Sequence, residues 1–450
     1  MKKQYYYPKT SEYFSKKINR YFQILSRILF VLVSIIFIHF LSSCNSELKV
    51  IVPDVQLLTS LQGTSSIPNS SRRLVEGVYV VESGFGEFGD TVILKHDREW
   101  LSIFCEKNSS YIVMQSGMKD STLYYAGYWR YAQSPRTGLC TLEIKPDDGA
   151  REILRAVARP QRIIIRGVFG GNEAVLRNPL VLRFVRGLFI RAHIKSDGKF
   201  WIIAHRGGGR NSDRLPFSEN STELIKFAGK LGANGVEIDV RLTKDGVPIL
   251  YHDENLNTRL INGEYMVGPI GNYTYAQIQE LCRLKNGERI PTLDDVLKAV
   301  VDSTSLTAVW LDIKEIAEIE KVIPMQKKYL ERARVLQELG KRDSLEIFFG
   351  LATTDIYNAF TAHPEHEQVP SICELGVSQT QTANSKVYAP RWTLGSLPTE
   401  VARLHIDNRR SFVWTLDQPE FIVKFLNEGD FDGILTNYPT VVAYHYYIRK

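Results

Sequence analysis

The sequence WIIAHRGGGRNSDRLPFSENSTELIKFAGKLGANGVEIDVRLTKDGVPILYHD, residues 201–253, predicts an α/β fold for the carboxyl-terminal half of the chain. Its apolar runs have the length of buried strands and lie at 201–204, 236–240 and 248–251. Between the first two runs, apolar residues recur at helical spacing over 222–233, and Asn220 or Ser221 can cap this helix. Lys244–Gly246 signals a turn before the third run.

Polar side chains lie at or near the end of each run. His205 follows the first run and His252 follows the third. Glu237 and Asp239 alternate with apolar residues in the second run, so they project from one face of a strand. This order of strand, helix, strand, turn and strand is typical of α/β proteins that build a site at the carboxyl edge of a parallel sheet.

Length and composition indicate a globular protein with more than one domain. At 450 residues the chain exceeds one ordinary domain, and its 44% hydrophobic and 24% charged residues are ordinary values. The net charge of +6 suits an anionic substrate or a membrane surface. Clustered basic runs of the kind that bind nucleic acid are absent from the sequence, so we expect no nucleic-acid partner.

Residues 1–44 are expected to be a targeting segment. A basic, Tyr-rich lead precedes a nearly continuous apolar run at 28–41, and the run ends at Leu41-Ser42-Ser43-Cys44. This pattern resembles the bacterial lipoprotein signal, in which the cysteine is lipidated and becomes the new amino terminus. The resemblance implies an exported cell-envelope protein anchored to the membrane through Cys44. The alternative is a plain transmembrane anchor, for which the run is short compared with the usual ~20 residues.

Four further cysteines, Cys105, Cys140, Cys282 and Cys373, show no C-x-x-C spacing and therefore predict no zinc site. An exported compartment permits disulfides, and Cys105 with Cys140 is the plausible pair. Buried free thiols are the equal alternative.

Residues 45–72 are rich in Ser, Thr, Gly, Pro and Asn and are expected to be a linker. Residues 73–193 contain many short β-type runs separated by turn residues, which predicts an all-β sandwich or barrel domain. No catalytic constellation is evident in this domain. The aromatic residues of 124–131 are expected to pack in its core rather than to bind a ligand.

Residues 194–450 have the length of one (β/α)8 TIM barrel, for which about 250 residues are typical. Nine strand candidates lie in this half, one more than the barrel needs. The least secure of them is 372–375. Loops that follow barrel strands are expected to set head-group specificity, and Asn255–Tyr273 is the loop expected to do so here.

Several motifs in this half resemble those of the glycerophosphodiester phosphodiesterase family. The family's HRG, ENT, ExD and HD elements stand here as His205-Arg206-Gly207, Glu219-Asn220-Ser221, Glu237-Ile238-Asp239 and His252-Asp253. Its later elements E-x-K, IPTLEEVL, WTVN and DGIITD.P correspond to 312–314, 290–297, 414–417 and 432–439. The resemblance covers about residues 200–440 and none of the all-β domain.

The resemblance implies a TIM-barrel phosphodiesterase that hydrolyses glycerophosphodiesters to glycerol phosphate and an alcohol. It implies that the catalytic residues are His205, His252, Arg206 and Lys314, with the histidines as base and acid. It further implies that Glu237, Asp239 and Asp312 hold the metal and that Glu219, Asn220 and Trp414 bind substrate. Carboxylate oxygens suit a hard cation such as Ca²⁺ or Mg²⁺.

Some of these residues also have simpler structural interpretations. Glu219 and Asn220, taken alone, form a helix cap, and Trp414 packs as often as it lines a pocket. Three residues depart from the family pattern, namely Asp312 for Glu, Asn437 for Asp and Ser218 for Pro. The alternative functions are phospholipase-C-like cleavage of an inositol phospholipid and a catalytically weakened envelope-binding protein.

Overall fold

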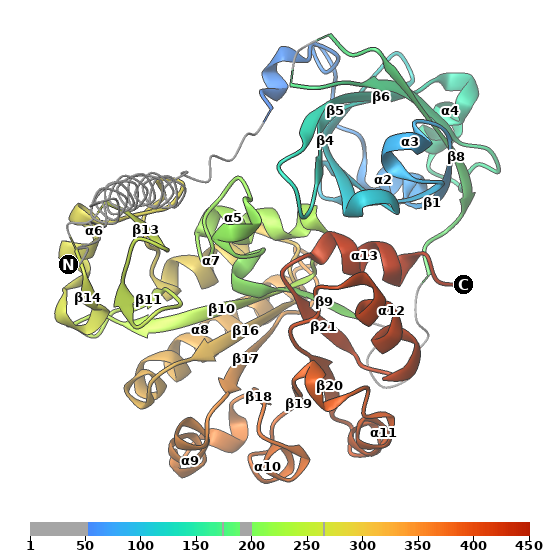
Figure 1. The fold of residues 1–450 in the computed structure, drawn as a ribbon. Helices are drawn as coiled ribbons and strands as arrows, with labels where there is room; N and C mark the ends of the chain where they lie inside the picture. The colour runs from blue at the N-terminus through green and yellow to red at the C-terminus, as the bar shows by residue number, and fades with distance from the viewer. Residues whose placement is uncertain (1–52, 173–174, 190–199, 264–265) are drawn as a thin grey trace, which may run out of the picture. The chain divides into compact units, whose positions relative to one another are not determined.

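The structure, a computed structural model, describes residues 53–172, 175–189, 200–263 and 266–450 (Figure 1). Val50–Lys450 form one compact unit. The predicted targeting segment and Cys44 lie outside the described residues. Within the described ranges, no helix combines the length and the apolar character needed to cross a membrane.

The first part of the described chain is a closed antiparallel barrel of eight strands, in which β1 pairs with both β2 and β8. The strands are β1 (Gly77–Ser83), β2 (Thr91–Asp97), β3 (Trp100–Cys105), β4 (Ser110–Lys119), β5 (Thr122–Tyr131), β6 (Thr137–Ile144), β7 (Ile164–Phe169) and β8 (Asn178–Arg186). Short helices α3 (Phe85–Phe88) and α4 (Ala150–Arg155) lie between strands. The predicted all-β domain is thus confirmed, and of the two architectures expected it is the barrel.

Part of the predicted linker, residues 45–72, differs from the expectation because it packs against this barrel. Ser65 forms an antiparallel bridge with Met118, with backbone N–O distances of 2.9 and 2.8 Å. Helix α2 (Asn69–Val75) follows, and Ile67 is buried in the same apolar cluster as the barrel interior. The burial of Ile67 and Val75 favours an ordered segment, which polar composition alone does not reveal.

The cysteines Cys105, Cys140, Cys282 and Cys373 are all buried free thiols, so the Cys105–Cys140 disulfide is not formed in the structure. Burial raises the pKa of the Cys105 thiol to about 12. A thiol held protonated in this way is unreactive at neutral pH.

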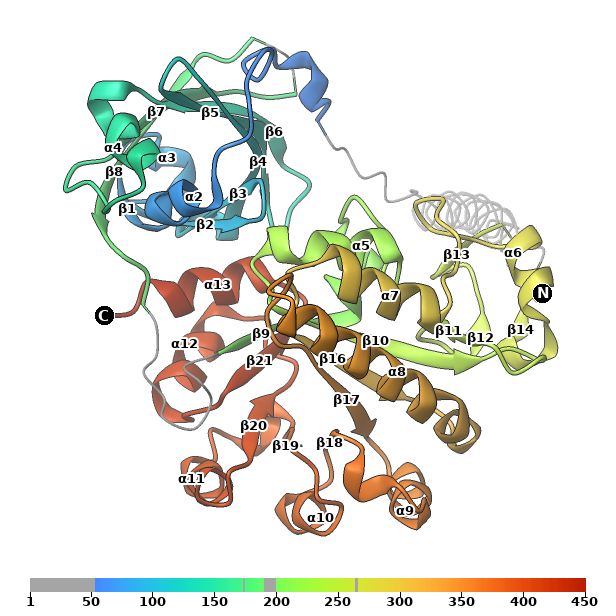
Figure 2. The same cartoon turned by 180° about the vertical axis from the view of Figure 1, so that it is seen from behind.

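The second part is a closed barrel of eight parallel strands (Figure 1), and it confirms the predicted TIM barrel. Its strands are β9 (Trp201–Ala204), β10 (Gly235–Leu242), β16 (Ala308–Ile313), β17 (Glu346–Leu351), β18 (Ser371–Cys373), β19 (Val387–Tyr388), β20 (Arg410–Val413) and β21 (Gly433–Thr436). The outer helices are α5 (Thr222–Phe227), α7 (Leu293–Ser303), α8 (Ile319–Glu338), α9 (Thr354–Ala362), α10 (Val377–Thr382), α11 (Pro398–Ile406), α12 (Pro419–Glu428) and α13 (Pro439–Tyr447). Helices α7 and α8 lie side by side against the strands (Figure 2).

Two strand predictions need correction. The segment 372–375, considered the least secure, supplies barrel strand β18. The extra strand is β11 (Pro248–Leu250), which pairs antiparallel with β10 and lies outside the barrel. The eight residues of β10 are followed by a tight turn in which Thr243 N donates to Val247 O at 3.1 Å, so the chain reverses as a hairpin. This return leads directly to His252, which therefore does not end a parallel strand.

An inserted segment between β11 and α7 has its own small core. It contains β12 (Asn255–Leu256), β13 (Ile261–Asn262), β14 (Gly268–Pro269), α6 (Tyr275–Leu281) and β15 (Arg283–Leu284), with two antiparallel pairings among its strands. Its buried apolar side chains, among them Leu256, Ile261 and Ile278, pack against Ile249 and Tyr251. The predicted specificity loop, Asn255–Tyr273, lies in this segment and contains β12, β13 and β14.

The two barrels share an apolar cluster that includes Phe104 and Tyr111 from the first and Tyr444 and Val442 from the second. Polar contacts accompany it. Ser102 Oγ donates to Lys230 O at 2.7 Å, and the hydroxyls of Thr91 and Tyr444 lie 2.7 Å apart.

Candidate active site

Three carboxylates meet at the carboxyl ends of two neighbouring strands. Glu237 and Asp239 point from one face of β10, and the parallel pairing with β16 places Asp312 opposite Asp239. One oxygen from each carboxylate lies within 4.8 Å of the others. The structure therefore brings together the three residues expected to bind a metal.

This carboxylate cluster fits a divalent cation. Glu237 is 3% and Asp239 1% exposed. Burial, and then the charges of Asp239 and Asp312, raise the pKa of Glu237 well above its usual range. Among the described residues Glu237 Oε1 has no hydrogen-bond partner. Because an unpaired buried acceptor is costly and all three ligands are oxygens, a hard cation such as Mg²⁺ or Ca²⁺ suits the cluster.

Lys314 supplies positive charge on one side of this cluster. Its Nζ lies 2.7 Å from Asp239 Oδ1 and also contacts Asp312 Oδ2. Burial lowers the pKa of Lys314, but the charges of Asp239 and Asp312 outweigh burial and raise the pKa above its usual range. The ammonium therefore stays charged. Because Lys314 contacts Asp239 and Asp312 but not Glu237, the negative charge of Glu237 has no direct lysine partner among the described residues.

His205, directly after β9, is held by a chain of polar side chains. Its Nδ1 lies 2.7 Å from Asn437 Oδ1, and Asn437 Nδ2 donates to Asp417 Oδ2 at 2.7 Å. Since the amide NH₂ is used by Asp417, Asn437 presents its oxygen and His205 Nδ1 must donate. His205 Nε2, 3.7 Å from Glu237 Oε2, then carries the free lone pair. Burial, and then Arg206, lower the pKa of His205 to about 4.

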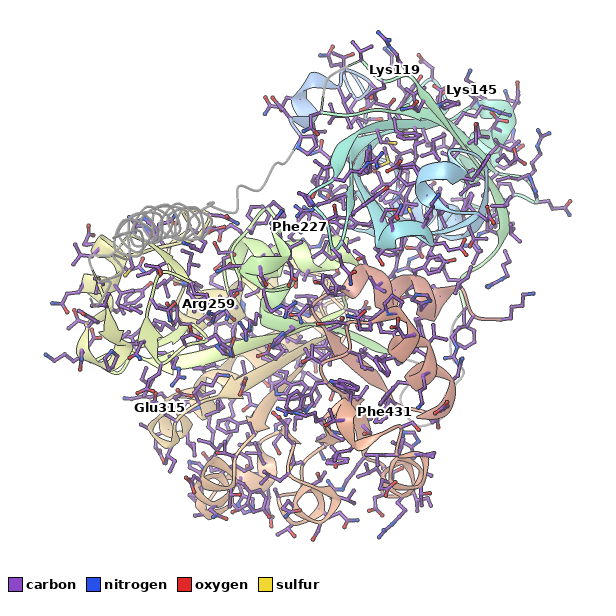
Figure 3. All side chains as sticks on the ribbon, viewed as in Figure 1. Lys119, Lys145, Phe227, Arg259, Glu315 and Phe431 are labelled. Atoms are coloured by element: carbon purple, nitrogen blue, oxygen red, sulfur yellow. The ribbon has the colours of Figure 1, made fainter. Side chains whose placement is uncertain are left out.

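His252 has a charged partner instead. Its Nδ1 lies 2.7 Å from Asp253 Oδ1, and Asp253 in turn accepts from Arg259 Nη2 at 2.6 Å and Asn257 Nδ2 at 2.7 Å. Arg259 comes from the inserted segment (Figure 3). Although burial raises the pKa of Asp253, Arg259 holds it well below its usual range, so Asp253 stays ionised.

Arg206 is buried and its backbone has a positive φ of 53°. This conformation lets its backbone N donate to Glu237 Oε2 at 2.8 Å while Nη1 donates to Glu219 Oε1 at 2.8 Å. Within the described structure Arg206 Nε has no hydrogen-bond partner, although it lies 3.9 Å from Asp239 Oδ2. The guanidinium is therefore fixed beside the carboxylates with a donor left over.

The predicted substrate-binding residues contact the site's own side chains. Glu219 pairs with Arg206, and Asn220 Nδ2 donates to Asp239 Oδ2 at 2.8 Å. The helix cap is Ser221, whose Oγ accepts from Leu224 N at 3.1 Å. Trp414 packs against the apolar barrel interior, and its Nε1 donates to Ala389 O at 2.8 Å. Glu219 and Asn220 thus orient the charged groups of the site.

Sequence reasoning missed Glu374 and the partners of the two histidines. Glu374 directly follows β18, and burial, followed by the charge of Asp312, raises its pKa to about 8. In the sequence Glu374 lies inside the strand candidate 372–375, the least secure of the nine, and no motif marks it. In the sequence Asn437 is recognisable only as a departure from the family pattern, and Asp253 only as part of the HD motif. Their hydrogen bonds to His205 and His252 require the fold.

The carboxyl-terminal half of the chain, which contains this site, is similar to known proteins. The sequence profile described as the glycerophosphoryl diester phosphodiesterase family matches residues 205–441. A glycerophosphodiester phosphodiesterase of Caldanaerobacter subterraneus subsp. tengcongensis is 30% identical over 54% of this chain and 95% of its own length. The probable glycerophosphodiester phosphodiesterase 2 of Mycobacterium tuberculosis is 29% identical over 52% and 86%. A solved glycerophosphodiester phosphodiesterase of Parabacteroides distasonis is 22% identical over 54% and 94%, with a TM-score of 0.42. The chain belongs to the glycerophosphoryl diester phosphodiesterase family.

Proposed function

We propose that the mouth of the parallel barrel hydrolyses glycerophosphodiesters to glycerol phosphate and an alcohol, with His205 as general base and His252 as general acid. The observation that carries this assignment is the unequal pairing of the two histidines beside one carboxylate cluster. His205 Nδ1 faces a neutral amide and His252 Nδ1 faces a carboxylate. A neutral partner on one histidine and a charged partner on the other fit the roles of base and acid.

Glu237, Asp239 and Asp312 would hold the cation, Mg²⁺ or Ca²⁺. When bound, the ion supplies positive charge that stabilises the phosphoryl oxygens. Lys314 and Arg206 add charge from the protein itself, and Arg206 has an unpartnered Nε within the described structure. A planar guanidinium suits two phosphoryl oxygens at once.

The histidines carry the protons. His205 Nε2 accepts a proton from water as the water oxygen attacks phosphorus. His252 Nε2 gives a proton to the leaving alcohol oxygen as its bond to phosphorus breaks. Asp253 orients the His252 ring through Nδ1, and Asn437 fixes the His205 tautomer by accepting from its Nδ1. The products are glycerol phosphate and the free alcohol.

The pH dependence of kcat/KM tests the role of Asn437. The base must be neutral, and the pKa of His205 is lowered to about 4, so activity should persist into mildly acidic solution. Asn437→Asp places a carboxylate on Nδ1, which favours imidazolium and raises the pKa. We expect the acidic limb of the profile to move to higher pH. Asp417→Asn/Asn437→Asp, which keeps the hydrogen bond between residues 417 and 437, should move it likewise. An unshifted limb in both variants contradicts this role.

Product analysis tests the proposed activity as a whole. Purified protein is given a panel of glycerophosphodiesters and an intact inositol phospholipid, with and without a chelator. We expect glycerol phosphate from the diesters, loss of turnover in chelator and recovery with Mg²⁺ or Ca²⁺. Turnover of the inositol lipid alone supports the phospholipase-C-like alternative instead.

Membrane attachment is a separate part of the proposal and rests on the sequence Leu41-Ser42-Ser43-Cys44. We propose that Cys44 is lipidated and tethers the two barrels to a membrane in the cell envelope. Cys44→Ala should release the protein from membranes or leave it unprocessed, as judged by fractionation and mass spectrometry of the amino terminus. Unchanged attachment with an intact amino terminus indicates a transmembrane anchor.

A further inference from the structure

A cavity of about 280 Å³ lies between the two barrels. The all-β barrel contributes Arg130 and the loop that follows β5, and the parallel barrel contributes Ser212–Arg214 and Tyr438. Tyr438 follows Asn437, the residue that holds His205 Nδ1. The cavity therefore adjoins the segments that carry the base, and it is several times larger than the roughly 30 Å³ share of one water molecule.

Arg130 is the main polar group of this cavity. Its side chain is 3% exposed, and Nη2 donates to Asp213 O at 3.3 Å. Its Nε has no hydrogen-bond partner among the described residues. Tyr111, opposite Arg130 across the β4–β5 ladder, does not line this cavity. Buried donors without partners are costly unless a ligand or water satisfies them.

The charge of the cavity wall is positive. Arg214, half-buried, lines the cavity, and within the described ranges its side chain has no ion pair or hydrogen bond. The one carboxylate of the wall, Asp213, is already engaged by the Arg210 side chain at 3.1 Å and by the Tyr438 hydroxyl at 2.7 Å. The guanidinium groups of Arg130 and Arg214 thus remain for a ligand.

We propose that this interbarrel cavity binds a small oxyanionic group, a phosphate or a carboxylate, through Arg130 and Arg214. Guanidinium groups pair with both anions through two parallel hydrogen bonds, and burial strengthens such pairs. The site gives the all-β barrel a part in ligand binding, because Arg130 belongs to β5. The anion is either free in solution or the anionic head group of a glycerophosphodiester, and the second source rests on the proposed function.

Binding is tested on the full-length protein in excess chelator, with inorganic phosphate as the probe and titration calorimetry as the readout. We expect saturable binding by the wild type and at least a tenfold weaker affinity for Arg214→Gln and Arg130→Gln. The matched control is Arg136→Gln, which removes an exposed arginine on the same loop that pairs with Glu87 and does not line the cavity. Because the Arg214 side chain is half-exposed, we expect Arg214→Gln to fold. The test can therefore be made with this variant even if Arg130→Gln fails to fold. Equal affinity of wild type and Arg214→Gln overturns the proposal.

Kinetics distinguish the two sources of the anion. KM is compared for a glycerophosphodiester whose alcohol carries a carboxylate or phosphate and for one whose alcohol is neutral. A head-group site predicts that Arg214→Gln raises KM about fivefold or more for the anionic substrate only. A free-anion site predicts that Arg214→Gln loses phosphate binding but leaves the KM values of both substrates unchanged. If Arg214→Gln changes neither, the cavity is not an anion site. Failure of the wild type to hydrolyse any substrate refutes the proposed activity and leaves the calorimetric test intact.

Discussion

Replacing His205 or His252 by alanine is expected to lower kcat by about 10²-fold or more, the usual scale for the loss of a general acid or base. Each histidine has its Nδ1 fixed by one partner, so Nε2 is the nitrogen available to the substrate. The alanine variants remove that nitrogen and leave the carboxylate cluster in place. Steady-state kinetics on a glycerophosphodiester, with circular dichroism to check the fold, measures the effect.

The control for both variants is His366→Ala, which changes a histidine in the short helix after α9, remote in sequence from both histidines. We expect it to keep near-normal turnover. The partners add a finer test, because Asp253→Asn should impair the acid and spare metal affinity. If both single alanine variants of the site histidines keep near-normal rates, the assignment of base and acid is wrong.

Asp312 is expected to set the strength of metal binding. It stands where the family usually has Glu, and its side chain is one methylene shorter. In the structure it still contacts Lys314 and lies within 4.8 Å of Glu237 and Asp239. We expect the cation to be bound directly or through water, more weakly than by a Glu. Asp312→Glu should preserve activity and tighten metal affinity, whereas Asp312→Ala should weaken both by about tenfold or more.

The measurement is activity against free Mg²⁺ or Ca²⁺ after chelator treatment, with calorimetry of metal binding in parallel. Glu315→Gln is a suitable control because Glu315 (Figure 3) follows the same strand but is exposed. Its carboxylate pairs with Arg241 at 2.7 Å. It should leave the metal dependence as it is. Full activity after exhaustive chelation, or an Asp312→Ala variant with unaltered metal dependence, contradicts the assigned ligands.

Much of the barrel and its acids could be predicted because local pattern and global fold agree there. Glu237 and Asp239 alternate with apolar residues that must be buried, so strand geometry fixes their common face. In the all-β barrel, turn residues separate apolar runs, and each run forms a strand. The closure of eight strands into a barrel depends on the pairing of β1 with β8, which no local signal contains.

The position of His252 could not be predicted from the apolar run that precedes it, residues 248–251. An antiparallel hairpin strand and a parallel barrel strand have the same short apolar pattern, so β11 resembled a barrel strand. Conversely, β18 has only three residues, too few for a clear pattern, and it carries Glu374 to the mouth. The contacts that orient the histidines are also nonlocal, since Asn437 and His205 are 232 residues apart.

The most direct test of the central claim is ³¹P NMR of the products formed in ¹⁸O-labelled water from one glycerophosphodiester, with and without chelator. We predict glycerol phosphate carrying one labelled oxygen on phosphorus, an unlabelled alcohol and no reaction in chelator until Mg²⁺ or Ca²⁺ is restored. Accumulation of a cyclic phosphate as the final product, label in the alcohol, or turnover that persists without metal would contradict the account.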